Sequence, residues 1–197
     1  MKATLTPSFA IGRILNAANK SRGAQRLQKG VTMIELSVVL VVGALLAAAV
    51  FFGLQANQRR VEVSDNTTAV TEIISSIKKT FGRANQYGVM TTALAVQSRA
   101  IPDNLRLTAA TAQNSYGGAI AIAPVVCVAA NDCASIMWPS VPQSQCMDLV
   151  IGTQAGARLI QVAAVTVKPL DGALNVATLA TQCELANTAL IEWRVGR

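Results

Sequence analysis

The sequence has 197 residues, which is enough for one globular domain with appendages. Hydrophobic residues make up 52% of it and charged residues only 14%, a balance that predicts a membrane segment in addition to any soluble domain. The formal charge of +7 is unevenly placed, because six of the 17 basic residues and none of the 10 acidic residues lie in the first 30 positions. The rest of the chain is nearly neutral, so no nucleic-acid partner is predicted.

Residues 1–30 are predicted to form a basic leader that ends in Gly30. A long apolar run follows it, and the positive-inside rule therefore keeps the leader in the cytoplasm and sends the C-terminal body outward. The cations of this segment are Lys2, Arg13, Lys20, Arg22, Arg26 and Lys29.

Residues 31–54 are predicted to form a hydrophobic helix. The stretch from Leu36 to Leu54 has 19 residues and no charge, and a helix of that length spans roughly 28 Å, close to the thickness of a bilayer core. Glu35 is the only charged residue of the segment. A secretory signal peptide cut near Ala47-Ala48-Ala49 and an ordinary single-span anchor are the alternatives, but neither explains a carboxylate near the start of an apolar run.

The residues around Gly30 resemble the cleavage site of type IV prepilins. In that family a basic leader ends in glycine, glutamate stands fifth after the cut and an apolar run follows. Here Lys29-Gly30 is followed by Val31-Thr32-Met33-Ile34-Glu35-Leu36. The long leader and the Val at the first mature position resemble the type IVb subclass, in particular the PilS-type major pilins of thin, adhesive or conjugative pili. The specific match covers roughly residues 25–60.

The resemblance implies a processing reaction and an assembly contact. Prepilin peptidase, a membrane aspartyl enzyme, would cut after Gly30 and N-methylate the new terminus of Val31. An unpaired carboxylate in lipid has a high free energy, and so has an unpaired ammonium group. Pairing Glu35 of one subunit with the Val31 amine of its neighbour would remove both unpaired charges. Type IVa pilins commonly carry a kinking proline in this helix; this chain has none, and only Gly43 and Gly53 offer local softening.

Residues 55–88 are predicted to be the amphipathic half of the same helix. A polar stretch, 55–60, marks the membrane exit, and apolar residues then recur with helical spacing. Gly82 or Gly88 is the expected stop, which gives one helix of roughly 50 residues. The apolar stripe consists of Val70, Ile73, Ile74, Ile77 and Phe81.

Residues 89–197 are predicted to be a globular head. Residues 89–118 are interpreted as a polar connection with turns at 102–104 and 116–118, the variable loop of pilins by resemblance. Strands are expected at 120–122 and 125–128, broken at Pro124, then at 159–167 and 190–195, while 147–151 fits a strand or a short helix. A helical spine followed by clustered strands predicts an α+β fold, in which a long N-terminal helix packs on an antiparallel sheet, the pilin α/β roll.

Four cysteines lie in the exported half, and an even number in an oxidising compartment predicts disulfides. Three connectivities are possible, and the sequence does not separate them. The pairing Cys127–Cys133 with Cys146–Cys183 is favoured because the second pair resembles the disulfide-bounded region near the pilin C-terminus.

No catalytic, metal or cofactor site is predicted. The chain has no histidine, no C-x2-C pair, no phosphate-binding loop and no G-x-S-x-G motif, so it is interpreted as the substrate of an enzyme and not as an enzyme. The glycosylation triplet Asn66-Thr67-Thr68 falls in the predicted helix and is interpreted as coincidence.

The sequence thus predicts the subunit of a type IVb pilus, used in adhesion, aggregation or conjugative cell contact. Its expected partners are identical subunits, prepilin peptidase with the assembly machinery, the inner membrane before assembly, and a host or recipient cell surface. The precursor is expected in the inner membrane with a periplasmic head, and the mature chain in an extracellular filament. A bitopic inner-membrane protein with a periplasmic binding head, or a minor pilin or pseudopilin, is the alternative.

Overall fold

The computed structural model describes residues 32–83 and 85–196. It divides into two compact units, Met1–Leu45 and Leu46–Arg197, each of which is described by itself. The first contains the start of a long helix, and the second contains the rest of that helix and the globular head.

Helix α1 (Met33–Phe81) is the predicted long helix, and its length of 49 residues matches the expectation. The predicted apolar stripe is buried in full: Val70, Ile73, Ile74, Ile77 and Phe81 are each 5% exposed or less. Gly82 follows the last helical residue, and a side chain there would clash with the backbone carbonyl oxygen of Lys78 and meet the Tyr87 hydroxyl at 2.8 Å, so the chain turns where only glycine fits.

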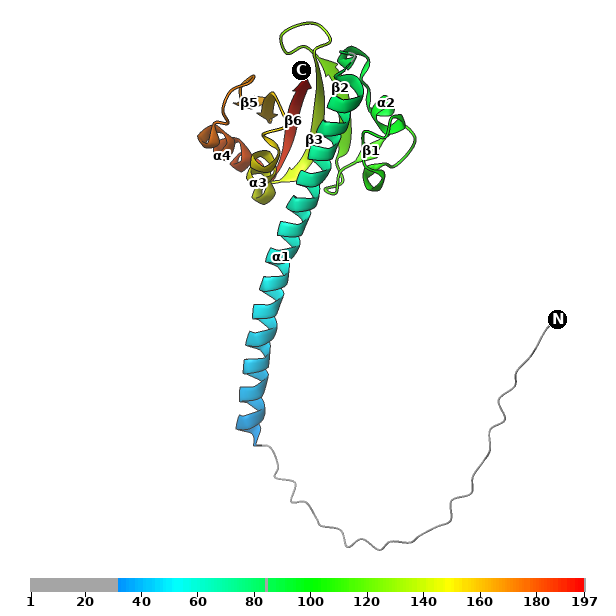
Figure 1. Cartoon of the computed structure of the whole chain (residues 1–197). Coiled ribbons are helices and arrows are strands. Elements are labelled where there is room, and N and C mark those ends of the chain that lie inside the picture. The colour runs from blue at the N-terminus through cyan, green and yellow to red at the C-terminus, as the bar shows by residue number, and fades with distance from the viewer. Residues whose placement is uncertain (1–31, 84, 197) are drawn as a thin grey trace, which may run out of the picture. The chain divides into compact units, whose positions relative to one another are not determined.

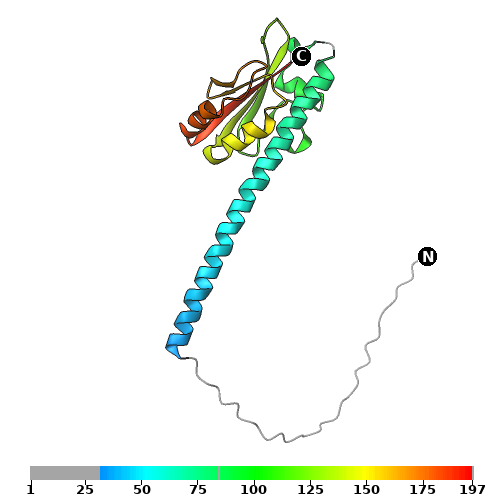
Figure 2. The same cartoon turned by 60° about the vertical axis from the view of Figure 1, so that its left-hand side comes forward.

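Six antiparallel strands form one sheet in the order β1-β2-β3-β6-β4-β5. Figure 1 and Figure 2 show the C-terminal part of α1 lying across a face of this sheet. Strand β6 buries every second residue over most of its length, as expected for a strand with one face on a core. The strands are β1 (Ala112–Gln113), β2 (Ala119–Val125), β3 (Cys133–Pro142), β4 (Leu159–Val162), β5 (Val165–Lys168) and β6 (Thr188–Gly196). The predicted α+β fold is confirmed.

The core centres on the two middle strands. Trp138 of β3 and Trp193 of β6 are fully buried and meet edge to face, with ring centroids 6.4 Å apart. Short helices complete the head: η1 (Tyr87–Val89), α2 (Thr92–Gln97), η2 (Asp103–Leu105), α3 (Gln143–Thr153) and α4 (Val176–Glu184). Residues 147–151, which the sequence left between strand and helix, therefore lie in a helix.

The head differs from the sequence prediction in two strands. Residues 159–167 form a hairpin and not one strand, because Ala163 and Ala164 adopt φ values of 49° and 66° and reverse the chain between β4 and β5. The predicted break at Pro124 is also wrong. Strand β2 continues through this proline and ends at Val125, so residues 126–128 of the second expected strand lie outside it. Pro124 is tolerated because it pairs with β3 only, while β1 pairs with β2 no further along than Ile120.

Two segments were also misjudged by composition. The expected polar connection 89–118 contains α2, η2 and β1, and it contributes Met90, Ala95 and Ile101 to the core. Strand β3 was not predicted, although it lies at the centre of the sheet. Its sequence includes prolines, and its pairing with β6 is irregular between Trp138 and Val141, where Ser140 has a φ of 63°.

Candidate functional site

The predicted processing residues Gly30 and Val31 lie outside the described residues, whereas the predicted assembly residue Glu35 is in the first turn of α1. Thr32 caps this turn: its Oγ1 accepts a hydrogen bond from the Glu35 backbone N–H at 3.3 Å, and its carbonyl accepts from Leu36 N–H at 3.1 Å. Thr32 and Glu35 thus have the spacing of a capping box, T-x-x-E. The sequence contained this signal, but the prediction did not use it.

The positive end of the helix dipole provides a favourable place for the Glu35 carboxylate. The same end is where cleavage after Gly30 would create an amine. The Glu35 carboxylate therefore stands where it favours the start of the helix, beside the intermolecular role that the resemblance implies.

The side chains around Glu35 are apolar and exposed. Among residues 32–45, the exposed large hydrophobic side chains are those of Met33, Ile34, Leu36, Val38, Val39, Leu40, Val41, Val42 and Leu45. Among the described residues, α1 is the helix that is long and apolar enough to cross a membrane, judged by length and composition. A side chain at Gly43 or Gly53 would meet no atom within 4 Å among the described residues, so packing among those residues does not require glycine at either position. Small residues of this kind allow close approach of other helices.

A buried polar network fixes α1 to the head. Gln145 of α3 is 4% exposed; it donates to the Glu62 carboxylate at 2.8 Å and accepts from the Tyr116 hydroxyl at 2.5 Å. Burial and, secondarily, the negative charge of Glu62 raise the pKa of Tyr116, so its hydroxyl stays protonated as a donor. Asn66 is also buried and bonds Ser115, which makes it inaccessible as a glycan acceptor.

Two disulfides stabilise the head. Cys127 is bonded to Cys133, with Cα atoms 5.8 Å apart, and Cys146 to Cys183, with Cα atoms 5.7 Å apart. These are the pairs favoured from the resemblance. The first closes the loop between β2 and β3, and the second joins α3 to α4.

Asp132 organises the loop that the first disulfide closes. Its carboxylate accepts hydrogen bonds from the backbone N–H groups of Cys127, Val128 and Ala129, at 2.7–2.9 Å. These bonds lower the pKa of Asp132 to about 2. Asp132 and the two cysteines are also the group of potential metal ligands found among the described residues, but both sulfurs are used in the disulfide and offer no thiolate.

Comparison with protein families gives two matches. The prokaryotic N-terminal methylation motif matches residues 25–51, and the family described as PilS N terminal matches residues 60–194. The first covers the segment around Gly30, Val31 and Glu35, and the second covers most of the head. A comparison with curated proteins finds no match.

Two solved pilin structures are similar to this chain, and the first of them shares its fold. A type IV b pilin from Salmonella typhi matches with a TM-score of 0.52 at 22% identity, over 70% of this chain and 99% of that one. TcpA, a type IV pilin from the El Tor biotype of Vibrio cholerae, matches with a TM-score of 0.46 at 16% identity, over 66% of this chain and 98% of that one.

A methylation motif, an apolar first helix and a helix-on-sheet head define the class of type IV pilin precursors. The chain belongs to the family described as PilS N terminal, and it carries the prokaryotic N-terminal methylation motif. The family and the fold are those of structural subunits, and the motif with its apolar helix suits a membrane-anchored precursor.

Proposed function

We propose that this chain is the structural subunit of a type IVb pilus, and that it polymerises through its N-terminal helix. The observation that carries the proposal is the exposed apolar surface of Met33–Leu45 with Glu35 as its charged group, inside the segment that matches the methylation motif. In a bilayer this surface is covered by lipid, and in a filament by the same surface of other subunits.

The precursor has four functional segments, and a single cut removes the first of them. Residues 1–30 are the leader that prepilin peptidase removes, and 31–54 are the membrane and filament-core segment. Residues 55–88 are the amphipathic half of the helix, and 89–197 the head with its disulfide-bounded region. The cut follows Gly30, and the new amine on Val31 is N-methylated.

Assembly then pairs the Glu35 carboxylate with the Val31 amine of a neighbouring subunit. Desolvation offsets much of the attraction in such a buried pair, so its value lies mainly in register and selectivity. Removing one partner leaves an uncompensated charge, which costs about 3–5 kcal/mol. Only a subunit that has been cut has the amine, so only processed chains can join the filament in this way.

The precursor stands in the inner membrane with a periplasmic head, and the filament acts outside the cell. Adhesion to a host, aggregation, or contact with a recipient cell in conjugation is the biological role. The disulfides support export, because such bonds persist in oxidising compartments.

Mass analysis of the N-terminus in surface-sheared material tests the proposal. We expect filaments made of a chain that starts at N-methylated Val31. A full-length chain with Met1, found in the membrane fraction and absent from the sheared fraction, would identify a bitopic membrane protein that does not polymerise. Trace amounts in otherwise normal filaments would identify a minor subunit.

A further inference from the structure

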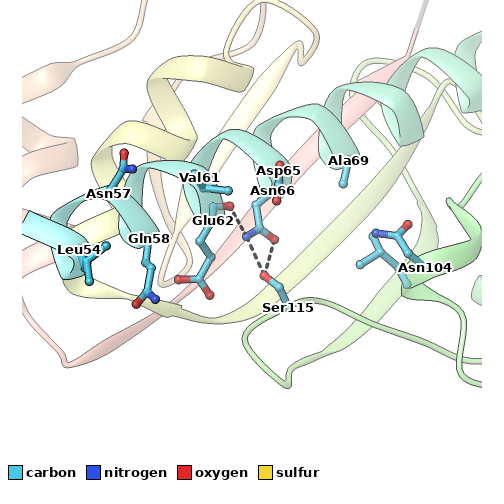
Figure 3. A pocket seen from close by; sticks show the side chains of 11 residues that line it. Leu54, Asn57, Gln58, Val61, Glu62, Asp65, Asn66, Ala69, Asn104 and Ser115 are labelled. Atoms are coloured by element: carbon cyan, nitrogen blue, oxygen red, sulfur yellow. Dashed lines mark hydrogen bonds between the residues drawn. The ribbon is translucent and has the colours of Figure 1, made fainter. Parts of the chain in front are cut away.

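A groove runs along one side of α1 within the unit Leu46–Arg197. Its lining includes the helical residues Leu54, Gln58, Val61, Glu62 and Asp65, with Leu105 and Ser115 on the opposite wall. Figure 3 shows Gln58 and Glu62 next to each other on the helix and Ser115 across from them, bonded to Asn66. We call this the acidic face, because its two charged groups are Glu62 and Asp65.

A second surface lies on another side of the same helix. It is lined by Arg59, Arg60 and Val63 of α1, and by Ser144, Gln145 and Asp148 of α3. We call it the basic face, because its two arginines outnumber its one carboxylate. At 100° per residue, Arg60 and Asp65 are about 140° apart around the helix, so the two faces point in different directions at the same level of α1.

No ion pair of the described residues neutralises the charges of the two faces. Among residues 32–83 and 85–196, the ion pairs are Arg106–Asp103, Arg158–Asp171 and Arg194–Glu192. Asp65, Arg59 and Arg60 are exposed and take part in none of them. Glu62 is held in place by the hydrogen bond from buried Gln145, which fixes its carboxylate before any partner arrives.

We propose that the acidic face of one copy of this chain binds the basic face of the next copy, with Asp65 and Glu62 opposite Arg60 and Arg59. The inference rests on the proposed function and adds to it a head-proximal contact, separate from the pairing of Glu35 with the Val31 amine.

Charge complementarity selects this occupant. Two acidic faces would repel each other, and so would two basic faces, so a contact between identical faces is disfavoured. Joining two different faces makes the interface heterologous, and such an interface repeats into a ring or an open helical polymer. The apolar side chains Leu54 and Val61, both exposed, supply area to be covered, while the charges set register and orientation.

A charge swap in the full-length chain tests the contact. Asp65→Lys and Arg60→Glu each place like charges across the interface, and each should strongly reduce the yield of sheared filaments. The double variant restores opposite charges and should recover filaments. Glu184→Lys, at an exposed carboxylate at the end of α4, is the matched control and should leave the yield unchanged.

Expression and processing of every variant are followed by the mature mass of the subunit. If both single variants assemble like the parent chain, the proposed contact is wrong. The contact is also wrong if the double variant forms no filaments although its mature subunit accumulates.

Zero-length carbodiimide cross-linking locates the contact directly. Arg60→Lys keeps the positive charge and supplies an amine that can be joined to a neighbouring carboxylate. We expect a ladder of cross-linked subunits in filaments, with position 60 joined to Asp65 or Glu62. Arg99→Lys, at an exposed site outside both faces, should give no new bond to these two carboxylates.

The outcomes separate the two proposals. The proposed contact is wrong if normal filaments form but position 60 is joined to other carboxylates or to none. In that case the proposed function still stands. A parent chain that never forms filaments overturns both.

Discussion

At the scale of single residues, Asp132 shows how one carboxylate can order a loop. Three consecutive backbone N–H donors near the end of β2 point at it, and they favour the ionised form. The pKa in the fold, about 2, is below the ordinary value of 3.8. The stabilising contribution is therefore complete above about pH 4 and is lost as the pH falls toward 2.

Asp132→Asn should remove this pH dependence. An amide oxygen still accepts hydrogen bonds, but it carries no charge and does not titrate. We expect the parent chain to lose thermal stability between about pH 4 and pH 2, and the variant to start lower and change less over that window. Melting curves of the detergent-solubilised chain at a series of pH values measure this. Identical profiles for the two chains would contradict the assignment.

Thr153 provides a hydrogen-bond acceptor for a buried donor inside the core. Its Oγ1 accepts from the indole N–H of Trp193 at 2.9 Å, and both residues are buried. Among the described residues, the indole nitrogen of the neighbouring Trp138 has no hydrogen-bond partner, so Trp193 is the one of the pair whose N–H is satisfied.

Thr153→Val keeps the shape of the side chain and leaves the Trp193 N–H unpaired. A buried unsatisfied donor costs about 1–3 kcal/mol, so we expect the free energy of unfolding to fall by that amount. Denaturant titration followed by tryptophan fluorescence measures it. Thr166→Val, at an exposed position of β5, is the matched control and should change stability far less.

At the scale of elements, the parts with strong periodicity were predictable. The stripe from Val70 to Phe81 repeats with helical spacing over three turns, and β6 alternates over nearly its whole length. Both are long enough for the pattern to exceed chance, and both were placed to within a few residues.

The remaining elements lacked a local signal. The hairpin turn at Ala163-Ala164 uses neither glycine nor asparagine, although both positions have positive φ. Strand β3 contains prolines and an irregular register, and its burial comes from its two neighbours in the sheet. Helix α4 has only nine residues, and it is fixed by its disulfide to α3. These features depend on contacts distant in sequence.

In the candidate site too, local features could be predicted from the sequence, whereas features that depend on the fold could not. Gly30 and Glu35 could be predicted from the sequence because their motif and spacing are local, and the capping residue Thr32 lies in the same short segment. The acidic and basic faces were not identified. They combine α1 with residues 105–115 on one side and with α3 on the other, and that arrangement appears only in the fold.

The two disulfides should differ in their contribution to stability. The Cys127–Cys133 bond closes a separation of 6 residues and the Cys146–Cys183 bond one of 37. Chain-entropy arguments give about 2 and about 4 kcal/mol, respectively. We expect replacement of both Cys146 and Cys183 by Ala to lower the unfolding midpoint more than the same change at Cys127 and Cys133. Equal losses would show that the loop-closure argument does not apply here.

At the scale of the whole molecule, processing should precede assembly. Gly30→Asp places a charged side chain where the peptidase needs close access to the backbone. We expect the variant to remain uncut in the inner membrane, and immunoblots of membrane and sheared fractions measure this. A mature-sized product from this variant would show that the cut lies elsewhere.

Glu35 has two roles in this scheme, and two substitutions separate them. Glu35→Gln keeps a side chain that the capping box accepts, while it removes the charge. Glu35→Val removes both the charge and the polar side chain that the capping box accepts. If the charge acts in assembly, both variants are cut normally and neither forms filaments, because the amine of each incoming subunit stays unpaired. A cost of about 3–5 kcal/mol per contact lowers subunit association by roughly two to four orders of magnitude. Normal filaments from Glu35→Gln, together with failure of Glu35→Val, would assign Glu35 to helix initiation with Thr32 and reject the pairing.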